Sequence, residues 1–355
     1  MAEFKVGIIG TGRPLRTEGA TGFGMAHRHM AGYRNSGRCE LAAVADIKPE
    51  NAEAFVEEYN PEAPVYTDYM EMMRQEDLDV VSVCLWPHLH AEVVCKIAPL
   101  GPRAIHCEKP MDIHWDASLR MHETCRDHGV QLTINHQRRF NEPFQEAKGL
   151  LDDGAIGEIE RMEAAWHNLF DSGTHWLDML FFFNDETPAE WVLGQVDTRG
   201  GKRIFGALVE GQGIATFHFE NGVRATMFTG KDYEDIGCMI RVIGDEGALE
   251  IMESAPWLRV RRAGEAAWDV IETEESIHDD AAIYRGIDDL LDCLDSGETP
   301  LLSSENAIRA TEIFFAAYES SRRRGRIDLP LAPGPSALLA MVEAGEVELP
   351  EGVEA

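Results

Sequence analysis

Residues 104–110 read Ala-Ile-His-Cys-Glu-Lys-Pro, an apolar run that ends in a charged pair and a proline. The run has the composition of a buried strand, and Pro110 restricts the residue before it to an extended conformation. Lys109 is therefore expected at the carboxyl end of a strand, the edge at which open α/β sheets bind ligands. A plain turn would also explain Glu108-Lys109-Pro110, and only motifs elsewhere in the chain decide between the two.

The first 135 residues alternate short apolar runs with helical stretches. Strands are predicted at 5–9, 41–45, 80–85, 103–107 and 131–135, with helices at 25–34, 49–59, 67–74, 90–100 and 116–128. Because the strand candidates are apolar on both faces, we expect a parallel sheet covered by helices. The predicted fold class of residues 1–135 is α/β, a doubly wound parallel sheet.

Beyond residue 140 the pattern changes to alternating runs separated by glycine-containing turns. Residues 213–219 and 223–228 flank Asn221-Gly222, a pair that is typical of a tight hairpin. Successive hairpins predict an open, mostly antiparallel sheet, which can leave one face free for a partner. Helices are expected at 277–294 and 304–323. We therefore predict a C-terminal α+β domain at 136–330 for substrate binding and oligomerisation, and an acidic extension at 331–355.

Bulk properties exclude several classes of protein. The chain has 355 residues, enough for two cores, and it contains no apolar stretch long enough for a membrane span. Its net charge of −31 argues against a nucleic-acid partner. The seven cysteines are scattered, which suits a reducing compartment, and the start of the chain lacks a signal-peptide pattern, so we expect a cytoplasmic protein. Two His-x-His pairs lack a third ligand at metal-site spacing, so no metal is expected.

A phosphate-binding turn is predicted directly after the first strand. Gly10 permits a tight turn, Thr11 follows, and Gly12 lets the backbone approach a pyrophosphate. The best candidate for the third glycine of this fingerprint is Gly24, which implies an insertion at 13–23. The insertion either lines the cofactor or substrate or forms a solvated loop.

An acidic residue stands at the end of the second predicted strand. In a Rossmann domain a carboxylate at the position of Asp46 hydrogen-bonds the adenosine ribose and repels a 2′-phosphate. NAD is therefore the expected cofactor, with NADP as the alternative because Arg13, Arg16 and Lys48 could offset the repulsion. Asp46 could instead cap the helix that begins at Pro49.

In this order the motifs resemble those of the glucose–fructose oxidoreductase/inositol dehydrogenase/rhizopine catabolism (Gfo/Idh/MocA) family. The matching motifs are Gly10-Thr11-Gly12, Val44-Ala45-Asp46, Trp86-Pro87-His88-Leu89-His90, Cys107-Glu108-Lys109-Pro110, Gln137-Arg138-Arg139-Phe140 and Asp171-x-Gly-x-His175. The resemblance covers about residues 4–330. It implies a Rossmann domain followed by a domain whose open sheet often makes oligomer contacts, in a dimer or tetramer. The implied reaction is NAD(P)-dependent oxidation of a secondary hydroxyl of a sugar, cyclitol or related polyol.

The resemblance also implies roles for single residues. Lys109 would be the cation that favours the developing alkoxide, His175 the base, and Asp171 a group that orients the substrate or the proton relay. The cofactor-binding residues would be Gly10, Thr11, Gly12, Gly24, Asp46, Trp86, Pro87, His90, Glu108 and Lys109. The substrate-binding residues would be Lys109, Arg138, Arg139, His167, Asn168, Asp171 and His175.

Structural alternatives stay open for several of these residues. His175 could be a core histidine beside Trp176, and Asp171 could be a helix N-cap. Arg138 and Arg139 either grip substrate oxygens or brace the domain junction.

The chain also departs from the family pattern at two places. Trp86 replaces a more usual Thr or Asn, and His167-Asn168-Leu169-Phe170 replaces a glycine-rich run, so the sugar specificity of the family cannot be transferred.

Two other functions are compatible with the same motifs. One is an NAD-dependent glycosidase of this fold, in which the cofactor is reduced and reoxidised while a glycosidic bond breaks. The other is a non-catalytic NAD(P)-binding regulator, although a regulator has no need to keep both Lys109 and His175.

Overall fold

The computed structural model describes residues 3–14, 16–18, 20, 22–231 and 233–349, which fall into two compact units. The first unit contains the described residues up to Ile113, Ala117–Gln137 and Asp280–Glu305. The second contains His114–Asp116, Arg138–Asp279 and the described residues from Asn306 onward. The insertion predicted at 13–23 and the extension predicted at 331–355 lie partly outside the described residues.

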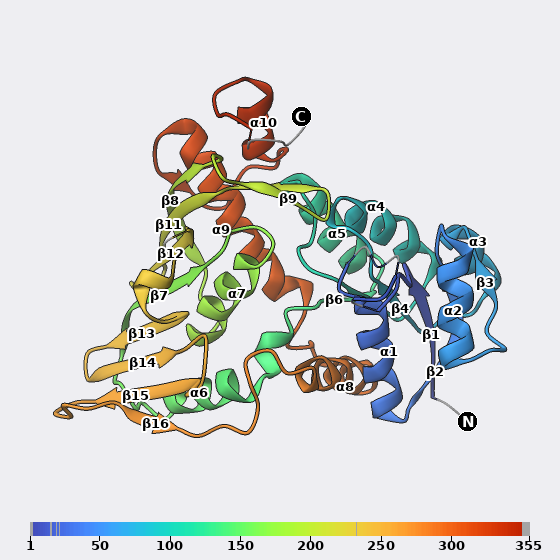
Figure 1. Cartoon of the computed structure of the whole chain (residues 1–355), viewed down its shortest axis with the longest axis horizontal. Helices are drawn as coiled ribbons and strands as arrows, with labels where there is room; N and C mark the ends of the chain where they lie inside the picture. Colours follow the sequence, from blue (N-terminus) through green and yellow to red (C-terminus); the bar gives the residue numbers. More distant parts are fainter. Residues whose placement is uncertain (1–2, 15, 19, 21, 232, 350–355) are drawn as a thin grey trace. The chain divides into compact units, whose positions relative to one another are not determined.

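The first unit is built on a six-stranded parallel sheet with the order β3-β2-β1-β4-β5-β6. Its strands are β1 (Phe4–Ile9), β2 (Cys39–Ala45), β3 (Val65–Tyr66), β4 (Val80–Val83), β5 (Ala104–Cys107) and β6 (Gln131–Ile134). The connecting helices are α1 (Met25–Ser36), α2 (Pro49–Tyr59), α3 (Tyr69–Gln75), α4 (Pro87–Ile97) and α5 (Trp115–Asp127) (Figure 1). The predicted Rossmann fold is confirmed, and its strand order reverses between β1 and β4, where such sheets bind ligands.

Proline fixes the start of two of these helices. Pro49 and Pro87 occupy the first turns of α2 and α4, where the missing N–H leaves no hydrogen bond unmade. The helix predicted at 90–100 therefore begins three residues earlier, and the strand predicted at 80–85 ends at Val83. Trp86 is the N-cap residue of α4 and is 42% exposed.

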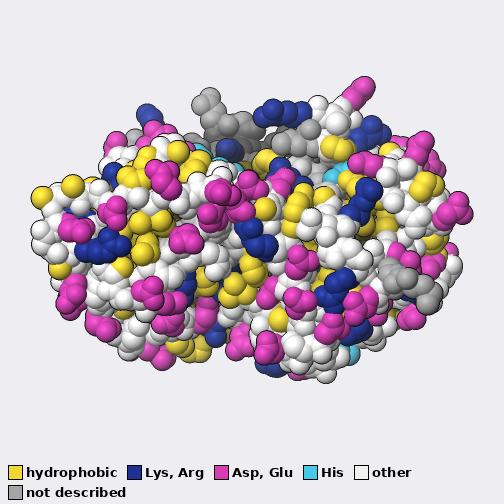
Figure 2. Space-filling model, turned by 90° about the horizontal axis from the view of Figure 1, so that it is seen from below, with side chains coloured by type: hydrophobic (Ala, Val, Ile, Leu, Met, Phe, Trp, Pro, Cys, Tyr) yellow, Lys and Arg dark blue, Asp and Glu magenta, His cyan; other side chains and the backbone are white. Residues whose placement is uncertain are grey.

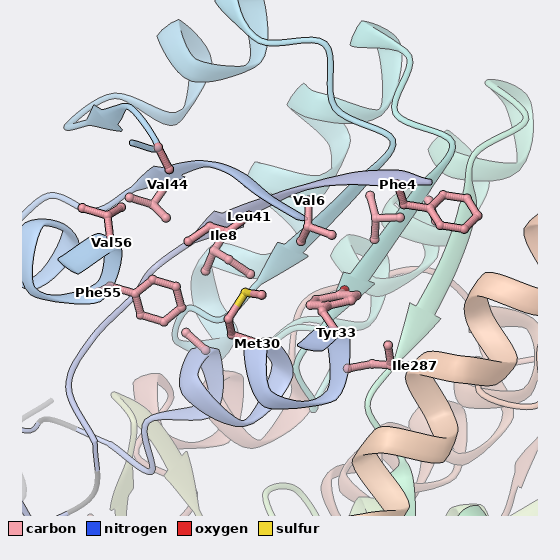
Figure 3. Close-up of a cluster of buried hydrophobic side chains, with 14 of the residues drawn as sticks. Phe4, Val6, Ile8, Met30, Tyr33, Leu41, Val44, Phe55, Val56 and Ile287 are labelled. Carbon is pink, nitrogen blue, oxygen red and sulfur yellow. The ribbon is translucent and has the colours of Figure 1, made fainter. Parts of the chain in front are cut away.

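A helix from late in the chain, α8 (Ala281–Ser296), belongs to the first unit. Its Ile287 joins a core that includes Phe4 of β1 and Tyr33 of α1, and Figure 3 shows Tyr33 and Met30 pointing from α1 toward the sheet. Gly32 permits this close approach, since a Cβ there would lie 2.5 Å from Cδ1 of Ile287. The helix was predicted to begin at residue 277, but it begins at Ala281.

The second unit is built on a nine-stranded mixed sheet with the order β16-β15-β14-β13-β7-β12-β11-β8-β17. The sheet strands are β7 (Ile159–Trp166), β8 (Ala189–Asp197), β11 (Gln212–Phe219), β12 (Arg224–Gly230), β13 (Ile240–Gly244), β14 (Gly247–Ile251), β15 (Leu258–Arg262), β16 (Asp269–Ile271) and β17 (Ile327–Asp328). A separate hairpin pairs β9 (Lys202–Ile204) with β10 (Ala207–Val209), and the helices are α6 (Glu142–Asp152), α7 (Gly173–Phe183), α9 (Ser304–Arg323) and α10 (Ala337–Glu343). Only β7 and β12 pair in parallel within the described part of this sheet, so the mostly antiparallel prediction is confirmed.

The hairpin predicted around Asn221-Gly222 is present. It joins β11 to β12, which pair from Gln212↔Gly230 to His218↔Arg224. Gly222 has a φ of 92°, which a residue with a side chain would adopt only under strain.

Acidic side chains are spread over the surface and form no single patch in the face seen in Figure 2, where Lys and Arg lie among them. Within the part of the chain that the structure describes, no helix is long and apolar enough to cross a membrane.

Candidate active site

The turn after β1 has the geometry of a phosphate-binding turn. Gly10 has a φ of +83°, and a Cβ there would lie 2.6 Å from Cδ2 of Leu85 and 2.8 Å from the carbonyl oxygen of Cys84. Gly12 has a φ of +55°, and a Cβ there would meet no heavy atom of the described residues within 4 Å. Gly24 has a φ of 65° and directly precedes α1. The space on the Cα side of Gly12 is thus free of described atoms, which allows the close approach that a pyrophosphate needs.

Asp46 ties the end of β2 to this turn. Its Oδ2 accepts hydrogen bonds from the Thr11 hydroxyl at 2.9 Å and the Gly12 N–H at 3.0 Å. Its Oδ1 accepts one from the N–H of Lys48 at 2.9 Å. The N-cap residue of α2 is Lys48, so the alternative in which Asp46 itself caps that helix is wrong. The residues fit a dinucleotide: open glycine backbone for the pyrophosphate, and a half-buried carboxylate at the end of β2 for the ribose.

The described part of the insertion after Gly12 is held by α2. The Arg13 side chain donates from Nε to Oδ1 of Asn51 at 2.9 Å and from a terminal nitrogen to the Glu18 carbonyl at 3.2 Å. Both contacts bind the Arg13 side chain to other residues of the protein. They are compatible with an insertion that lines the ligand site and with a solvated loop. Residues 15, 19 and 21 lie outside the described residues.

Lys109 lies in the turn that follows the carboxyl end of β5, and contacts with Glu108 and His90 hold this turn in place. Its backbone N–H donates to Oε2 of Glu108 at 3.3 Å, and Lys109 and Pro110 are joined by a cis peptide bond. The two ring nitrogens of His90 face the carbonyl oxygens of Pro110 at 2.8 Å and Leu85 at 3.0 Å. His90 is fully buried, and burial lowers its pKa. We infer that His90 positions the Lys109 turn rather than contacting the cofactor directly.

A buried polar network beneath this turn was missing from the sequence prediction. Oε1 of Glu108 lies 2.9 Å from Nε2 of His29 and accepts from Nδ2 of Asn135 at 2.7 Å. Nδ1 of His29 contacts the Ser82 hydroxyl at 3.2 Å, and Ser82 contacts the Tyr33 hydroxyl at 2.9 Å. Burial would raise the pKa of Glu108, but the hydrogen bonds and charge of its partners outweigh burial and lower the pKa to about 2. Glu108 is therefore a carboxylate at neutral pH.

In the second unit, His175 and Asp171 lie at the start of α7. His175 is in the first turn of the helix and is 6% exposed. Ser172 is the N-cap residue, so the alternative in which Asp171 caps α7 is wrong. Asn168 is buried, and its Oδ1 accepts from the N–H groups of Asp171 at 2.7 Å and Ser172 at 3.3 Å. Its side chain thus shapes the turn before α7.

Both arginines predicted to bind substrate are buried and engaged within the second unit. Arg139 makes two hydrogen bonds of 2.8 Å to Asp178 and one of 2.5 Å to Glu186. Arg138 lies over the Trp176 ring, 4.7 Å from its centroid, and donates to the Ile277 carbonyl. These contacts favour bracing over substrate binding for both side chains.

His167 is exposed and stands among aromatic rings. Its ring centroid lies 4.6 Å from that of Trp166 and 4.7 Å from that of Tyr233. Tyr233 was not among the predicted site residues. Tyr233 also borders a cavity of about 730 Å³ on the sheet of the second unit, whose lining contains none of the predicted site residues.

Among the described residues, no group of three His, Cys, Asp or Glu could hold a metal ion.

Fold and site together define an NAD(P)-binding oxidoreductase, and comparison with known proteins gives its family. Residues 4–136 match the NAD-binding Rossmann domain and residues 168–329 the C-terminal α/β domain of the Gfo/Idh/MocA oxidoreductase family. The chain therefore belongs to this family.

Relatives of the chain are distant in sequence. An inositol 2-dehydrogenase/D-chiro-inositol 3-dehydrogenase of Shouchella clausii is 26% identical over 350 residues, which span 93% of this chain and 95% of that protein. A levoglucosan dehydrogenase solved with NADH and L-sorbose has a TM-score of 0.79 at 19% identity, covering 94% of this chain and 100% of the other. The WlbA dehydrogenase of Bordetella pertussis, solved with NADH and UDP-GlcNAcA, has a TM-score of 0.71 at 20% identity, covering 94% and 99%. At such identities the solved structures bear on the fold alone.

Proposed function

We propose that the protein is an NAD-dependent dehydrogenase that oxidises a secondary hydroxyl of a sugar, cyclitol or related polyol. The observation that carries the proposal is the first unit itself, which places Lys109 at the carboxyl end of β5 in the same parallel sheet as the Gly10–Gly12 turn and Asp46. The similarity to the inositol 2-dehydrogenase/D-chiro-inositol 3-dehydrogenase supports the substrate class.

The chemistry divides among three groups. Bound NAD supplies the acceptor for the hydride that leaves the carbinol carbon. His175 takes the hydroxyl proton as the general base, because imidazole titrates near neutral pH. The Lys109 ammonium stabilises the negative charge that develops on the hydroxyl oxygen in the transition state. Asp171 orients the substrate or the imidazole of His175.

A substrate panel tests the proposal. Sugars, inositols and sugar acids are incubated with NAD and with NADP, and the absorbance of the reduced cofactor is followed. We expect NADH to accumulate with at least one polyol. Cleavage of a glycoside without net NADH would instead establish the glycosidase alternative, and tight NAD binding with neither reaction would favour a regulator.

The Asp46 carboxylate is expected to set the preference for NAD. Asp46→Asn keeps the size of the side chain and one acceptor oxygen but removes the charge that repels a 2′-phosphate. We expect the ratio of kcat/KM for NAD to that for NADP to fall by about 10-fold or more, equal to about 1.4 kcal/mol. Asp68→Asn is the matched control, since Asp68 follows β3 and only caps α3. A wild-type enzyme that prefers NADP would contradict this role.

We also propose that the protein forms a homo-oligomer, a dimer or tetramer, through the exposed face of the nine-stranded sheet. Leu193 of β8 and Ile214 of β11 are 49% and 39% exposed on neighbouring strands. Exposed apolar side chains that lie next to one another favour association with another protein surface. Ile214→Lys is expected to lower the molar mass measured by light scattering to that of a smaller species. Val270→Lys, on the edge strand β16 and 42% exposed, should leave the mass unchanged.

A further inference from the structure

A buried carboxylate in the second unit has no part in the chemistry proposed above. Glu210 follows β10 and is 2% exposed. Its Oε1 accepts hydrogen bonds from the Leu169 N–H at 2.5 Å and from the Thr229 hydroxyl at 3.1 Å, and its Oε2 accepts one from the Tyr318 hydroxyl at 2.8 Å. All three partners are neutral donors. Burial raises the pKa of Glu210, and it raises the pKa of Tyr318 so that the phenol keeps its proton and donates.

These donors come from three separate elements. Leu169 belongs to the loop between β7 and α7, Thr229 to β12, and Tyr318 to α9. A buried carboxylate is costly unless donors satisfy it, and a buried N–H without an acceptor is costly too. The Glu210 side chain therefore fixes the position of the Leu169 backbone relative to the sheet and to α9.

The rest of the loop leaves the backbone little freedom. Leu169 and Phe170 are buried, and the Phe170 ring lies 5.5 Å from that of Phe314 on α9. A Cβ at Gly173 would lie only 2.1 Å from the carbonyl oxygen of Asn168, so the turn closes tightly just before α7. His175 is two residues further along. A shift at Leu169 would be transmitted to Asp171 and to the first turn of α7.

We propose that Glu210 is a positioning residue, which acts through the Leu169 N–H to hold Asp171 and His175 where the reaction needs them. The proposal rests on the proposed function for its catalytic consequence. Burial accounts for the two apolar residues of this loop, since Leu169 and Phe170 anchor it in the core, while the backbone N–H of Leu169 is the hydrogen-bond partner of the carboxylate.

Three variants test the role of Glu210. Glu210→Leu removes every acceptor, whereas Glu210→Gln keeps an amide oxygen that can accept from Leu169 and Thr229. Tyr318→Phe is the matched control, since it removes one donor and leaves the Leu169 bond intact. We expect Glu210→Leu to lower kcat by about 100-fold, because small misplacements of catalytic groups cost about that much. Glu210→Gln and Tyr318→Phe should stay within a few-fold of wild type, and the Kd for NAD should not change in any variant.

Hydrogen exchange separates positioning from simple destabilisation and does not depend on a substrate. The amides of residues 169–172 should lose protection in Glu210→Leu but not in Glu210→Gln, while the amides of β12 keep theirs. A folded Glu210→Leu protein with wild-type kcat, or with unchanged protection at 169–172, would overturn the proposal. If Glu210→Leu does not fold, Glu210→Asp serves instead, since a side chain shorter by one methylene is expected to withdraw the carboxylate from the Leu169 N–H. If wild type oxidises no polyol, the proposed function fails, and the exchange data still decide whether Glu210 fixes the loop.

Discussion

Replacement of Lys109 by alanine is expected to lower kcat by about 10²–10³-fold while the Kd for NAD stays within a few-fold of wild type. Loss of a group that stabilises developing negative charge costs about 10²–10³-fold in kcat. The variant should fold normally, because the turn is held by atoms that the substitution leaves in place. These are the backbone N–H of Lys109 bound to Glu108, and the Pro110 carbonyl bound to His90.

Steady-state kinetics on the substrate found by the panel, together with calorimetric titration of NAD, would measure both halves of this expectation. Lys96→Ala is the matched control: Lys96 lies on α4 in the same unit, exposed and paired with Glu92 at 2.5 Å. Turnover retained in Lys109→Ala would reject the catalytic role of the lysine. A large loss of NAD affinity would show instead that the side chain serves cofactor binding.

Local sequence patterns predicted most of the first unit because each of its elements is defined by its own residues. Prolines at helix starts and apolar runs of strand length act within a few positions, and so does the Asn221-Gly222 pair that predicted the hairpin of the second unit. The partner of α8 could not be predicted in this way. The apolar face of residues 281–296 shows that the helix is buried, but only the folded chain shows that Ile287 packs on Gly32 of α1.

The same distinction between local and distant partners separates the site residues that were predicted from those that were missed. The glycine turn and Asp46 were found because strand, turn and acidic strand end follow a fixed order in the chain. The buried partners of Glu108 were missed because they are far from it in sequence: His29 lies 79 residues from Glu108. Leu169 and Glu210 are 41 residues apart. A single histidine on the buried face of α1 or a glutamate after a short strand has no local pattern that reveals its partner.

The contact between His29 and Glu108 is expected to make a large single contribution to the stability of the first unit. The His29 side chain is fully buried and that of Glu108 is 8% exposed. Removal of one partner of a buried pair leaves an uncompensated charge and costs about 3–5 kcal/mol. His29→Leu should therefore lower the free energy of unfolding by about 3 kcal/mol at pH 7.

The cost of His29→Leu in unfolding free energy is expected to depend on pH. Because folding lowers the pKa of Glu108, the carboxylate stabilises the fold above pH 4.5, and this contribution is lost as the pH falls toward 2. Without His29, the two largest contributions that lower the pKa of Glu108 are lost, and this pKa is expected to be higher than in wild type. The difference in unfolding free energy between wild type and His29→Leu should therefore be largest at neutral pH and shrink below pH 4.5, as urea denaturation at several pH values would measure.

A double-variant cycle separates the buried charge from the lost packing of the imidazole. Glu108→Gln removes the charge at nearly constant volume, so His29→Leu combined with Glu108→Gln should cost less than the sum of the two single changes. His128→Leu is the control for the substitution itself, because His128 is exposed and bonds only the Thr124 carbonyl among its described partners. Additive losses in the cycle, or a cost of His29→Leu that is constant from pH 7 to pH 3, would show that Glu108 does not depend on His29 for its charge. In that case Asn135 and the Lys109 N–H would have to hold the carboxylate without it.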